Sequence, residues 1–279
     1  MKKIIHLAHS PDSDDAFMFY ALATGKIDTE EFEFIHELQD IETLNRRALK
    51  AELEVTAASI HAYAFLADKY ALLPHGASMG EGYGPRLVAR EALSRAQLRT
   101  RTVAVPGLLT SAYLALQLYL PGVATVVVPF DEILERVAAG QHDVGLLIHE
   151  GQLTYADAGL HMIRDLGEWW AAETGGLPLP LGGNLIRKDL GEAVIKRVSR
   201  MLRASIAYGL QHRSDAIAHA ETYGRGLDTA KTDEVVGMYV NERTLDYGPD
   251  GRRAVQLFLD RGHEAGIIPK RVQAVFVED

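Results

Sequence analysis

The chain has 279 residues, of which 47% are hydrophobic and 24% are charged. This composition is typical of a soluble globular protein that is long enough for two modest domains. Its formal net charge of −9 argues against a nucleic-acid partner, because binding to phosphates needs a basic face. The chain has no cysteine, which excludes disulfides, thiolate catalysis and cysteine-ligated metals.

The N-terminal residues and the hydropathy of the chain bear on its location. The apolar stretch that follows Lys3 is too short and too interrupted for the hydrophobic core of a signal peptide. No window approaches the ~20 apolar residues that a membrane helix needs. We therefore expect a cytoplasmic protein with no membrane insertion, while the oligomeric state stays open.

The first part of the chain alternates between strand and helix patterns. The predicted strands cover residues 4–8, 32–38, 54–58, 70–73 and 85–89. The predicted helices cover residues 16–24 and 40–51 and a segment after Ser59 that runs through Leu66. Strands that alternate with helices in this way indicate βαβ units and a parallel sheet.

A second alternating unit begins near Arg101. Its predicted strands cover residues 102–105, 125–128 and 144–148, and its predicted helices cover 110–119 and 130–139. The Gly- and Pro-rich segment 171–183 leads back to a short strand at 185–187, and helices are predicted at 194–211, 214–223, 231–239 and 251–265. The helical tail has no sheet of its own, so we expect it to pack on the first unit. The predicted α/β fold thus has a central cleft between a discontinuous lobe 1 (residues 1–99 and 184–279) and lobe 2 (100–183).

His149 is the leading candidate for a catalytic residue. It follows the apolar run Val144–Ile148, which reads as a fully buried strand of a parallel sheet. Such sheets place their ligands at the carboxyl ends of the strands, and histidine is the side chain best suited to proton transfer near neutral pH. A structural histidine at a strand end is the alternative. Glu150 is expected to face away from His149, because adjacent residues of a strand point to opposite faces.

Three loops that join a strand to a helix supply polar groups. The loop from Ser10 to Asp15, which contains Asp14, either caps the following helix or lines the cleft. The segments Ala57-Ala58-Ser59 and Thr110-Ser111-Ala112 each place backbone amides and hydroxyls at a helix start, where an anion can bind. No histidine pair has the i, i+4 spacing with a carboxylate of a zinc protease, so no metal site is predicted. No Gly-x-Ser-x-Gly nucleophile elbow occurs.

These residues resemble a known family, 1,4-dihydroxy-6-naphthoate synthase of the futalosine route to menaquinone. The matching segments span most of the chain in order: Ser10-Pro11 with Asp14–Phe17, Asp40–Asn45, Val103–Gly107 with Thr110–Tyr113, Ile148–Glu150 with Thr154-Tyr155, Asp165–Trp170 and Gly175–Gly183. The family often has Cys-Pro-Asn where this chain has Asp12-Ser13-Asp14.

The resemblance implies a periplasmic-binding-protein-like (type II) fold of two α/β lobes around a cleft. It implies a carbon–carbon lyase without cofactor that cleaves cyclic dehypoxanthine futalosine to 1,4-dihydroxy-6-naphthoate. It places the catalytic base at His149 and the substrate contacts at Ala57, Ala58, Ser59, Thr110, Ser111 and Ala112.

Two alternatives stay open. One is chorismate dehydratase, a related enzyme of the same pathway with the same fold, although the His-Glu pair and the double tryptophan favour the synthase. The other is a non-catalytic protein that binds a small carboxylate solute, since this fold serves many such modules. A binding module of that kind would need export or tethering, and the expected absence of a signal peptide argues against it.

Overall fold

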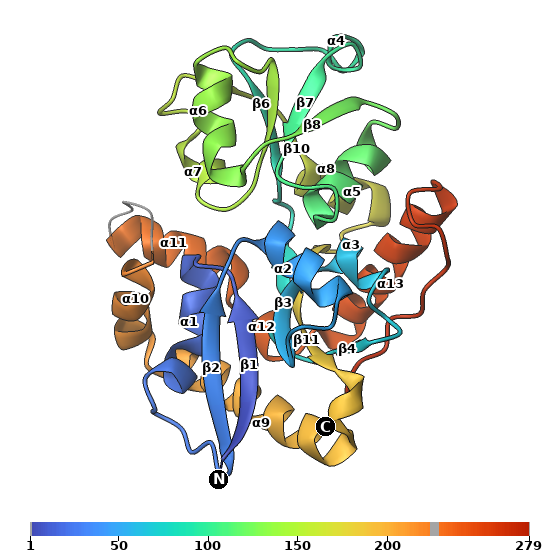
Figure 1. Cartoon of the computed structure of the whole chain (residues 1–279). Coiled ribbons are helices and arrows are strands. Elements are labelled where there is room, and N and C mark those ends of the chain that lie inside the picture. The colour runs from blue at the N-terminus through green and yellow to red at the C-terminus, as the bar shows by residue number, and fades with distance from the viewer. Residues whose placement is uncertain (1, 224–228, 279) are drawn as a thin grey trace.

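The computed structural model describes residues 2–223 and 229–278, which form two lobes, one above the other in Figure 1. The first sheet has the strand order β2-β1-β3-β11-β4, with β5 paired to β11, and the second has the order β10-β6-β9-β7-β8. Helices cover both sheets, so the predicted two-lobed α/β fold is confirmed.

The first lobe is built on a mixed sheet. Its strands are β1 (Lys3–His9), β2 (Phe32–Leu38), β3 (Val55–Ser59), β4 (Tyr70–Leu72), β5 (Ser78–Gly80) and β11 (Leu179–Arg187). β1 pairs in parallel with β2 and β3, whereas β11 runs antiparallel to β3, β4 and β5. The carboxyl ends of β1 and β3 therefore point to the same edge of the sheet, where their following loops face the second lobe.

The helices of the first lobe come from both ends of the chain. They are α1 (Ser13–Ala23), α2 (Ile41–Leu49), α3 (Ile60–Tyr63), α9 (Glu192–Gln211), α10 (Arg213–Glu221), α11 (Thr229–Tyr239), α12 (Glu242–Leu245) and α13 (Gly248–Glu264), with a 3₁₀ turn η2 at Lys188–Leu190. As predicted, the helical C-terminal part packs on this lobe, with α9, α10 and α11 against α1 (Figure 1). Phe17, Leu202 and Ile206 belong to the buried apolar cluster between these helices.

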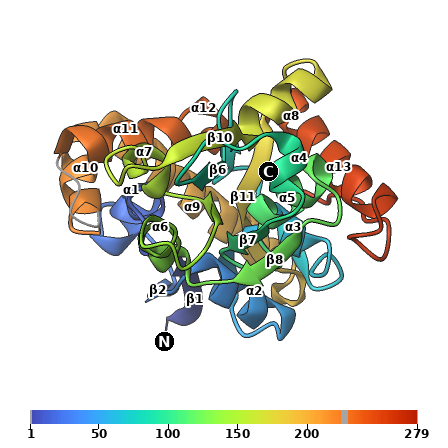
Figure 2. The ribbon, with the colours of Figure 1, turned by 90° about the horizontal axis from the view of Figure 1, so that it is seen from above.

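The second lobe has its own sheet and core. Its strands are β6 (Arg86–Ala89), β7 (Thr102–Val105), β8 (Ala124–Val127), β9 (Val144–Leu147) and β10 (His161–Asp165). Its helices are α4 (Arg95–Leu98), α5 (Ser111–Tyr119), α6 (Ile133–Ala138), α7 (Gly151–Thr154) and α8 (Leu166–Thr174), with a 3₁₀ turn η1 at Phe130–Glu132. Seen from above in Figure 2, α6 lies on one side of this sheet and α5 and α8 on the other.

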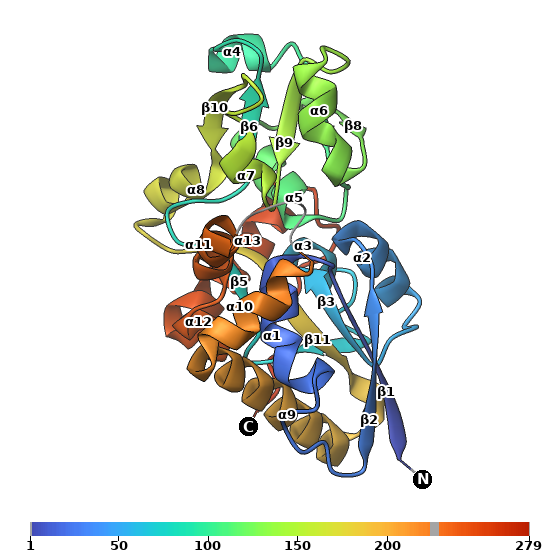
Figure 3. The ribbon, with the colours of Figure 1, turned by 90° about the vertical axis from the view of Figure 1, so that its left-hand side faces the viewer.

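The predicted boundaries between the lobes, at 99/100 and 183/184, need correction. β6 pairs antiparallel with β9 and β10, so the second lobe already includes residue 86, and Figure 3 shows these three strands together in the upper lobe. The chain has returned to the first sheet by Leu179, where β11 pairs with β5. The buried run Leu87–Ala89 needs backbone partners on both sides, and its apolar pattern does not say which sheet provides them.

β9 is buried on both faces, which is why the sequence reads as an uninterrupted apolar run there. Leu146 packs into the cluster under α5 and α8, and Leu147 into the cluster under α6. Among the helices that the structure describes, none has the length and apolar character needed to cross a membrane.

Candidate active site

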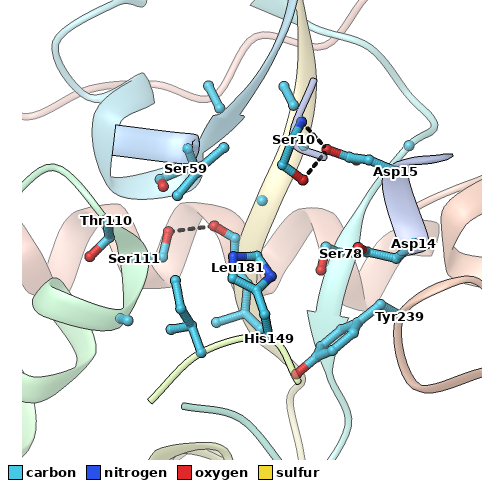
Figure 4. A pocket seen from close by; sticks show the side chains of 18 of the residues that line it. Ser10, Asp14, Asp15, Ser59, Ser78, Thr110, Ser111, His149, Leu181 and Tyr239 are labelled. Carbon is cyan, nitrogen blue, oxygen red and sulfur yellow. Dashed lines mark hydrogen bonds between the residues drawn. The ribbon is translucent and has the colours of Figure 1, made fainter. Parts of the chain in front are cut away.

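A cavity lies between the two lobes at the carboxyl ends of β1, β3 and β9. Every candidate site residue predicted from the sequence lines it: Ser10, Asp14, Ala57, Ala58, Ser59, Thr110, Ser111, Ala112 and His149. The structure also brings Gln152 and Asn184 to its walls, together with four residues labelled in Figure 4: Asp15, Ser78, Leu181 and Tyr239. The strand-end argument therefore identified segments that converge on one place in the fold.

The sequence predicted a strand that runs to Ile148, directly before His149, whereas in the structure the strand is one residue shorter and His149 lies in a turn. β9 ends at Leu147, and the backbone of His149 has a φ of +56°, in the left-handed region that costs an L-residue about 1–2 kcal/mol. The amide of Gln152 stabilises this turn when its oxygen faces His149 N at 3.1 Å and its nitrogen faces the Gly84 carbonyl at 2.7 Å. Tyr239 adds a contact from its hydroxyl to the same amide.

The imidazole of His149 projects into the middle of the cavity (Figure 4). Its Nδ1 lies 3.2 Å from Oδ2 of Asp12, and the ring of Phe130 meets it edge-on at 5.2 Å between centroids. The side chain of His149 is 22% exposed, so one edge of the ring stays accessible from the cavity.

Four buried carboxyl groups surround this histidine, and we call Asp12, Asp14, Asp15 and Glu150 the acidic cluster. Burial raises the pKa of the Asp14 carboxyl well above its usual range, and the neighbouring Asp15 and Asp12 raise it further. Burial also raises the pKa of Asp15, although the hydrogen bonds from Ser10 N (2.7 Å) and Ser10 Oγ (2.8 Å) oppose the rise. Figure 4 shows this Ser10–Asp15 pair at the cavity wall. Asp14 is therefore a proton-carrying group near neutral pH.

Glu150 follows His149 directly in the sequence but does not share its place at the cavity wall. It is not among the described residues that line the cavity, and it acts on Asp14 as a nearby like charge. The sequence suggested that alternation along a strand would point Glu150 away from His149. That explanation does not apply, because both residues lie beyond the end of the strand, where α7 begins.

In the described part of the chain, one group has a spacing that would accommodate a metal ion. Asp12, Asp14 and His149 each offer one ligand atom, and these atoms lie within 4.8 Å of one another. Carboxylate oxygens with one imidazole suit a divalent cation such as Zn²⁺ or Mn²⁺. The same spacing equally serves a hydrogen bond between a carboxylate and an imidazole, so it does not by itself establish a metal site.

The two helix starts predicted to bind an anion are both at the cavity, but their hydroxyls already have protein partners. Thr110 caps α5, since its Oγ1 accepts a hydrogen bond from Tyr113 N at 3.1 Å. Ser111 Oγ donates to the Leu181 carbonyl at 2.5 Å, as Figure 4 shows. Ser59 Oγ accepts from Asn45 Nδ2 at 3.1 Å and keeps its own proton available for a ligand. The amides of Ser59 and His61 donate to Asn45 Oδ1 and Ser111 Oγ, so among the described groups the Ser59 hydroxyl and the amides of Ser111 and Ala112 are the donors left for a ligand.

Several contacts join the lobes beside these helix starts. The amide of His61 in the first lobe donates to Ser111 Oγ at 3.2 Å. Oε2 of Glu42 accepts from Leu109 N at 3.2 Å, and a Cβ on Gly107 would lie 2.3 Å from that same oxygen. Glycine at 107 is therefore required for this close approach, and the lobes touch at the back of the cavity.

The comparisons with known proteins agree with this architecture. Residues 5–264 match the model of a family described as "Menaquinone biosynthesis". The 1,4-dihydroxy-6-naphthoate synthase of Thermus thermophilus is 40% identical over 273 residues, which cover 98% of this chain and 99% of the relative. That of Streptomyces coelicolor is 37% identical, with 95% of each chain covered. The chain belongs to the 1,4-dihydroxy-6-naphthoate synthase family.

Solved structures extend this result. A protein from Archaeoglobus fulgidus is 46% identical, with a TM-score of 0.89 over 95% of this chain and 98% of that one. The alkanesulfonate-binding protein SsuA of Xanthomonas axonopodis pv. citri, bound to MOPS, has a TM-score of 0.70 at 14% identity over 98% of this chain and 97% of that one, which shows a shared fold alone. The predicted binding-protein-like architecture, the resemblance to the synthase family and the expectation of an enzyme of menaquinone biosynthesis are confirmed.

Sequence reasoning missed several residues at the site of this synthase family member. Asp12, which contacts His149, lay within the predicted loop but was not selected. Gln152 lies in a segment that was not assigned, Asn184 directly follows the predicted connection 171–183, and Tyr239 ends the predicted helix 231–239. Asn184 is buried, and in the described part of the chain its Nδ2 has no hydrogen-bond partner. The aspartate-rich composition of the first loop is the signal that would have found Asp12, whereas nothing local marks Tyr239, which arrives by tertiary packing of α11.

Proposed function

We propose that this protein cleaves cyclic dehypoxanthine futalosine to 1,4-dihydroxy-6-naphthoate, as a carbon–carbon lyase that needs no cofactor. His149 is the general base. The observation that carries the proposal is the placement of its imidazole in the cavity between the lobes, on a turn stabilised by Gln152. The name of the relatives, which match nearly the full chain at 37–40% identity, supports the product.

In this mechanism His149 removes a proton from the sugar-derived part of the substrate. The electrons of the broken bond to hydrogen start a retro-aldol-type fragmentation, in which a carbon–carbon bond breaks and its electron pair is taken up as the naphthalene ring becomes aromatic. A base positioned in this way supplies typically about 10²–10⁴-fold in rate. The contacts between the lobes exclude water from the reacting groups.

The remaining wall groups bind and orient the substrate in this proposal. The amides of Ser111 and Ala112 at the start of α5 hold a carboxylate, because a helix N-terminus favours negative charge, with Thr110 fixing that helix start. The protonated Asp14 donates a hydrogen bond to polar sugar groups, and Ser10 Oγ, whose proton goes to Asp15, accepts one from a sugar hydroxyl. Ala57, Ala58 and Ser59 also line the cavity. In this proposal the protein binds a small molecule and neither a nucleic acid nor a membrane. It acts in the cytoplasm.

Product analysis by mass spectrometry tests this function. Purified protein is incubated with cyclic dehypoxanthine futalosine, and wild type is compared with His149→Asn and with the control His161→Asn, which changes an exposed histidine on β10. We expect 1,4-dihydroxy-6-naphthoate from wild type and the control, and a loss of about 10²–10⁴-fold in kcat for His149→Asn. Wild-type turnover by His149→Asn would exclude the mechanism.

Two further incubations separate the alternative functions. If chorismate yields the enolpyruvyl product of its dehydration, the protein is the dehydratase. If calorimetry detects binding of pathway intermediates but no product forms over hours, it is a binding module.

A further inference from the structure

The side chain of Asp12, near His149, does not make the hydrogen bonds that its position in the chain predicts. Asp12 occupies the N-cap position of α1, where an aspartate normally accepts hydrogen bonds from the first amides of the helix. Here its side chain makes no such bond. The carboxylate faces a different partner, since its Oδ2 lies 3.2 Å from Nδ1 of His149.

From this geometry we propose that Asp12 is the positioning residue of His149. The carboxylate accepts a hydrogen bond from Nδ1 and so leaves the lone pair of Nε2 for the substrate. The inference rests on the proposed role of His149 as the base. It adds the group that orients the imidazole and selects its tautomer.

The chemistry of the pair follows from its donors and acceptors. A neutral imidazole carries one N–H, and an ionised carboxylate can only accept, so contact at Nδ1 selects the tautomer protonated there. When Nε2 takes a proton from the substrate, the buried anion stabilises the imidazolium that results. The Asp12 side chain is 2% exposed, so little water competes for it.

The other members of the acidic cluster are not equivalent to Asp12. Asp15 is occupied by two hydrogen bonds from Ser10. Asp14 carries a proton near neutral pH because burial raises its pKa. Neither Glu150 nor Asp12 is among the residues described at the cavity wall, but Glu150 acts on Asp14 as a nearby like charge. Asp12 is the carboxylate whose contact with the imidazole the geometry shows directly.

The pair also joins the two lobes. Asp12 lies in the loop between β1 and α1 of the first lobe, and His149 follows β9 of the second. Gln152 fixes the backbone of His149, and Phe130 flanks its ring, but both come from the second lobe. The correct tautomer is therefore set across the cleft, and movement of the lobes apart would remove it.

The test observes the imidazole directly. The full-length protein is labelled with ¹⁵N-histidine, and the signals of His149 are assigned by their loss in His149→Asn. We expect the Nδ1-protonated tautomer in wild type and loss of this preference in Asp12→Asn. The same variant is expected to lower kcat by about 10²–10⁴-fold with KM within about threefold of wild type, because a positioning residue acts on the chemical step.

The matched control is Glu150→Gln, which removes a buried carboxylate one residue from His149. It should keep the wild-type tautomer, whereas a general loss of negative charge would shift it in both variants. If Asp12→Asn does not fold, the wild-type spectrum alone decides, since an Nε2-protonated His149 overturns the proposal.

Two other results would overturn it. One is Asp12→Asn with wild-type tautomer and kcat. The other is activity that EDTA abolishes and Zn²⁺ restores, since a cation would then occupy the cluster. If the spectra follow the expectation but wild type forms no product from cyclic dehypoxanthine futalosine, the proposed function fails and the Asp12–His149 pair stands.

Discussion

Replacing Asp14 with asparagine should stabilise the fold and weaken the enzyme. The carboxyl is buried within the acidic cluster, and its pKa is raised first by burial and then by the charges of Asp15 and Asp12. The native state therefore binds the Asp14 proton more tightly than the unfolded chain does. Asparagine has the same shape without the titratable charge, so it removes the free-energy cost of holding this group in the fold.

The sign and size of the effect follow from the direction of the shift. Because the folded pKa is raised, the cost is absent below the usual carboxyl pKa of about 3.9 and grows as the pH rises towards the folded value. A buried polar group in unfavourable surroundings costs about 1–3 kcal/mol. Since 1 kcal/mol shifts Tm by roughly 2–4 °C for a chain of this size, we expect a gain of about 2–12 °C at pH 8 and a smaller one at pH 5.

Thermal unfolding of wild type and Asp14→Asn, followed by circular dichroism at pH 4, 5, 6, 7 and 8, measures this effect. The gain in Tm should increase with pH across the series. A gain that is constant or decreases with pH would refute the assignment of a raised pKa to Asp14. A loss of stability at every pH would show that the carboxyl makes a net favourable contact.

Two further substitutions test the packing that holds the lobes and their connections. Gly167→Ala should destabilise the fold by about 3 kcal/mol or more, because the added Cβ would lie 1.9 Å from the Tyr83 carbonyl oxygen. The control is Gly237→Ala inside α11, where the nearest atom to the added Cβ is at 3.5 Å, and it should change stability by less than about 1 kcal/mol. Urea denaturation compares the two variants. Asp165→Ala should cost about 3 kcal/mol in the same assay, since Asp165 caps α8 through Gly167 N (2.9 Å) and pairs with Arg86 (3.1 Å); Asp165→Asn, which keeps a cap, should lose less, and an equal loss would contradict the role of the cap.

The sequence predicted well those elements whose burial leaves a recognisable pattern in their own residues. The run predicted as a strand at 144–148 is β9 at 144–147, because a segment buried on both faces leaves a continuous apolar signature. The strand at 85–89 was predicted as an element but placed in the wrong lobe, because its partners β9 and β10 are distant in sequence. No strand was predicted at 161–165, where the edge strand exposes both His161 and Met162 and shows no alternation of buried and exposed residues. The rest of β11 was hidden in a segment rich in Gly and Pro.

The site was predictable to the level of segments. Loops after parallel strands converge on one edge, so Ser10, Ser59 and His149 were correctly brought to a common cavity. Side-chain direction was not predictable, since it depends on the left-handed backbone of His149 and on an N-cap aspartate that does not cap. Both features depend on tertiary contacts, which local pattern does not encode.

The acidic cluster raises the question of how the fold tolerates so much buried carboxyl. Asp14 and Asp15 lie in the first turn of α1, where the positive end of the helix dipole favours negative charge by roughly 0.3–1 kcal/mol per group. The opposite face of α1 packs against α9 to α11, in a core that includes Phe17. The helix is thus fixed by apolar burial on one side and presents its N-terminus to His149 on the other. This arrangement explains why the expected gain from Asp14→Asn is a few kcal/mol and not the full cost of a buried charge: a proton, a helix dipole and the facing imidazole each remove part of that cost.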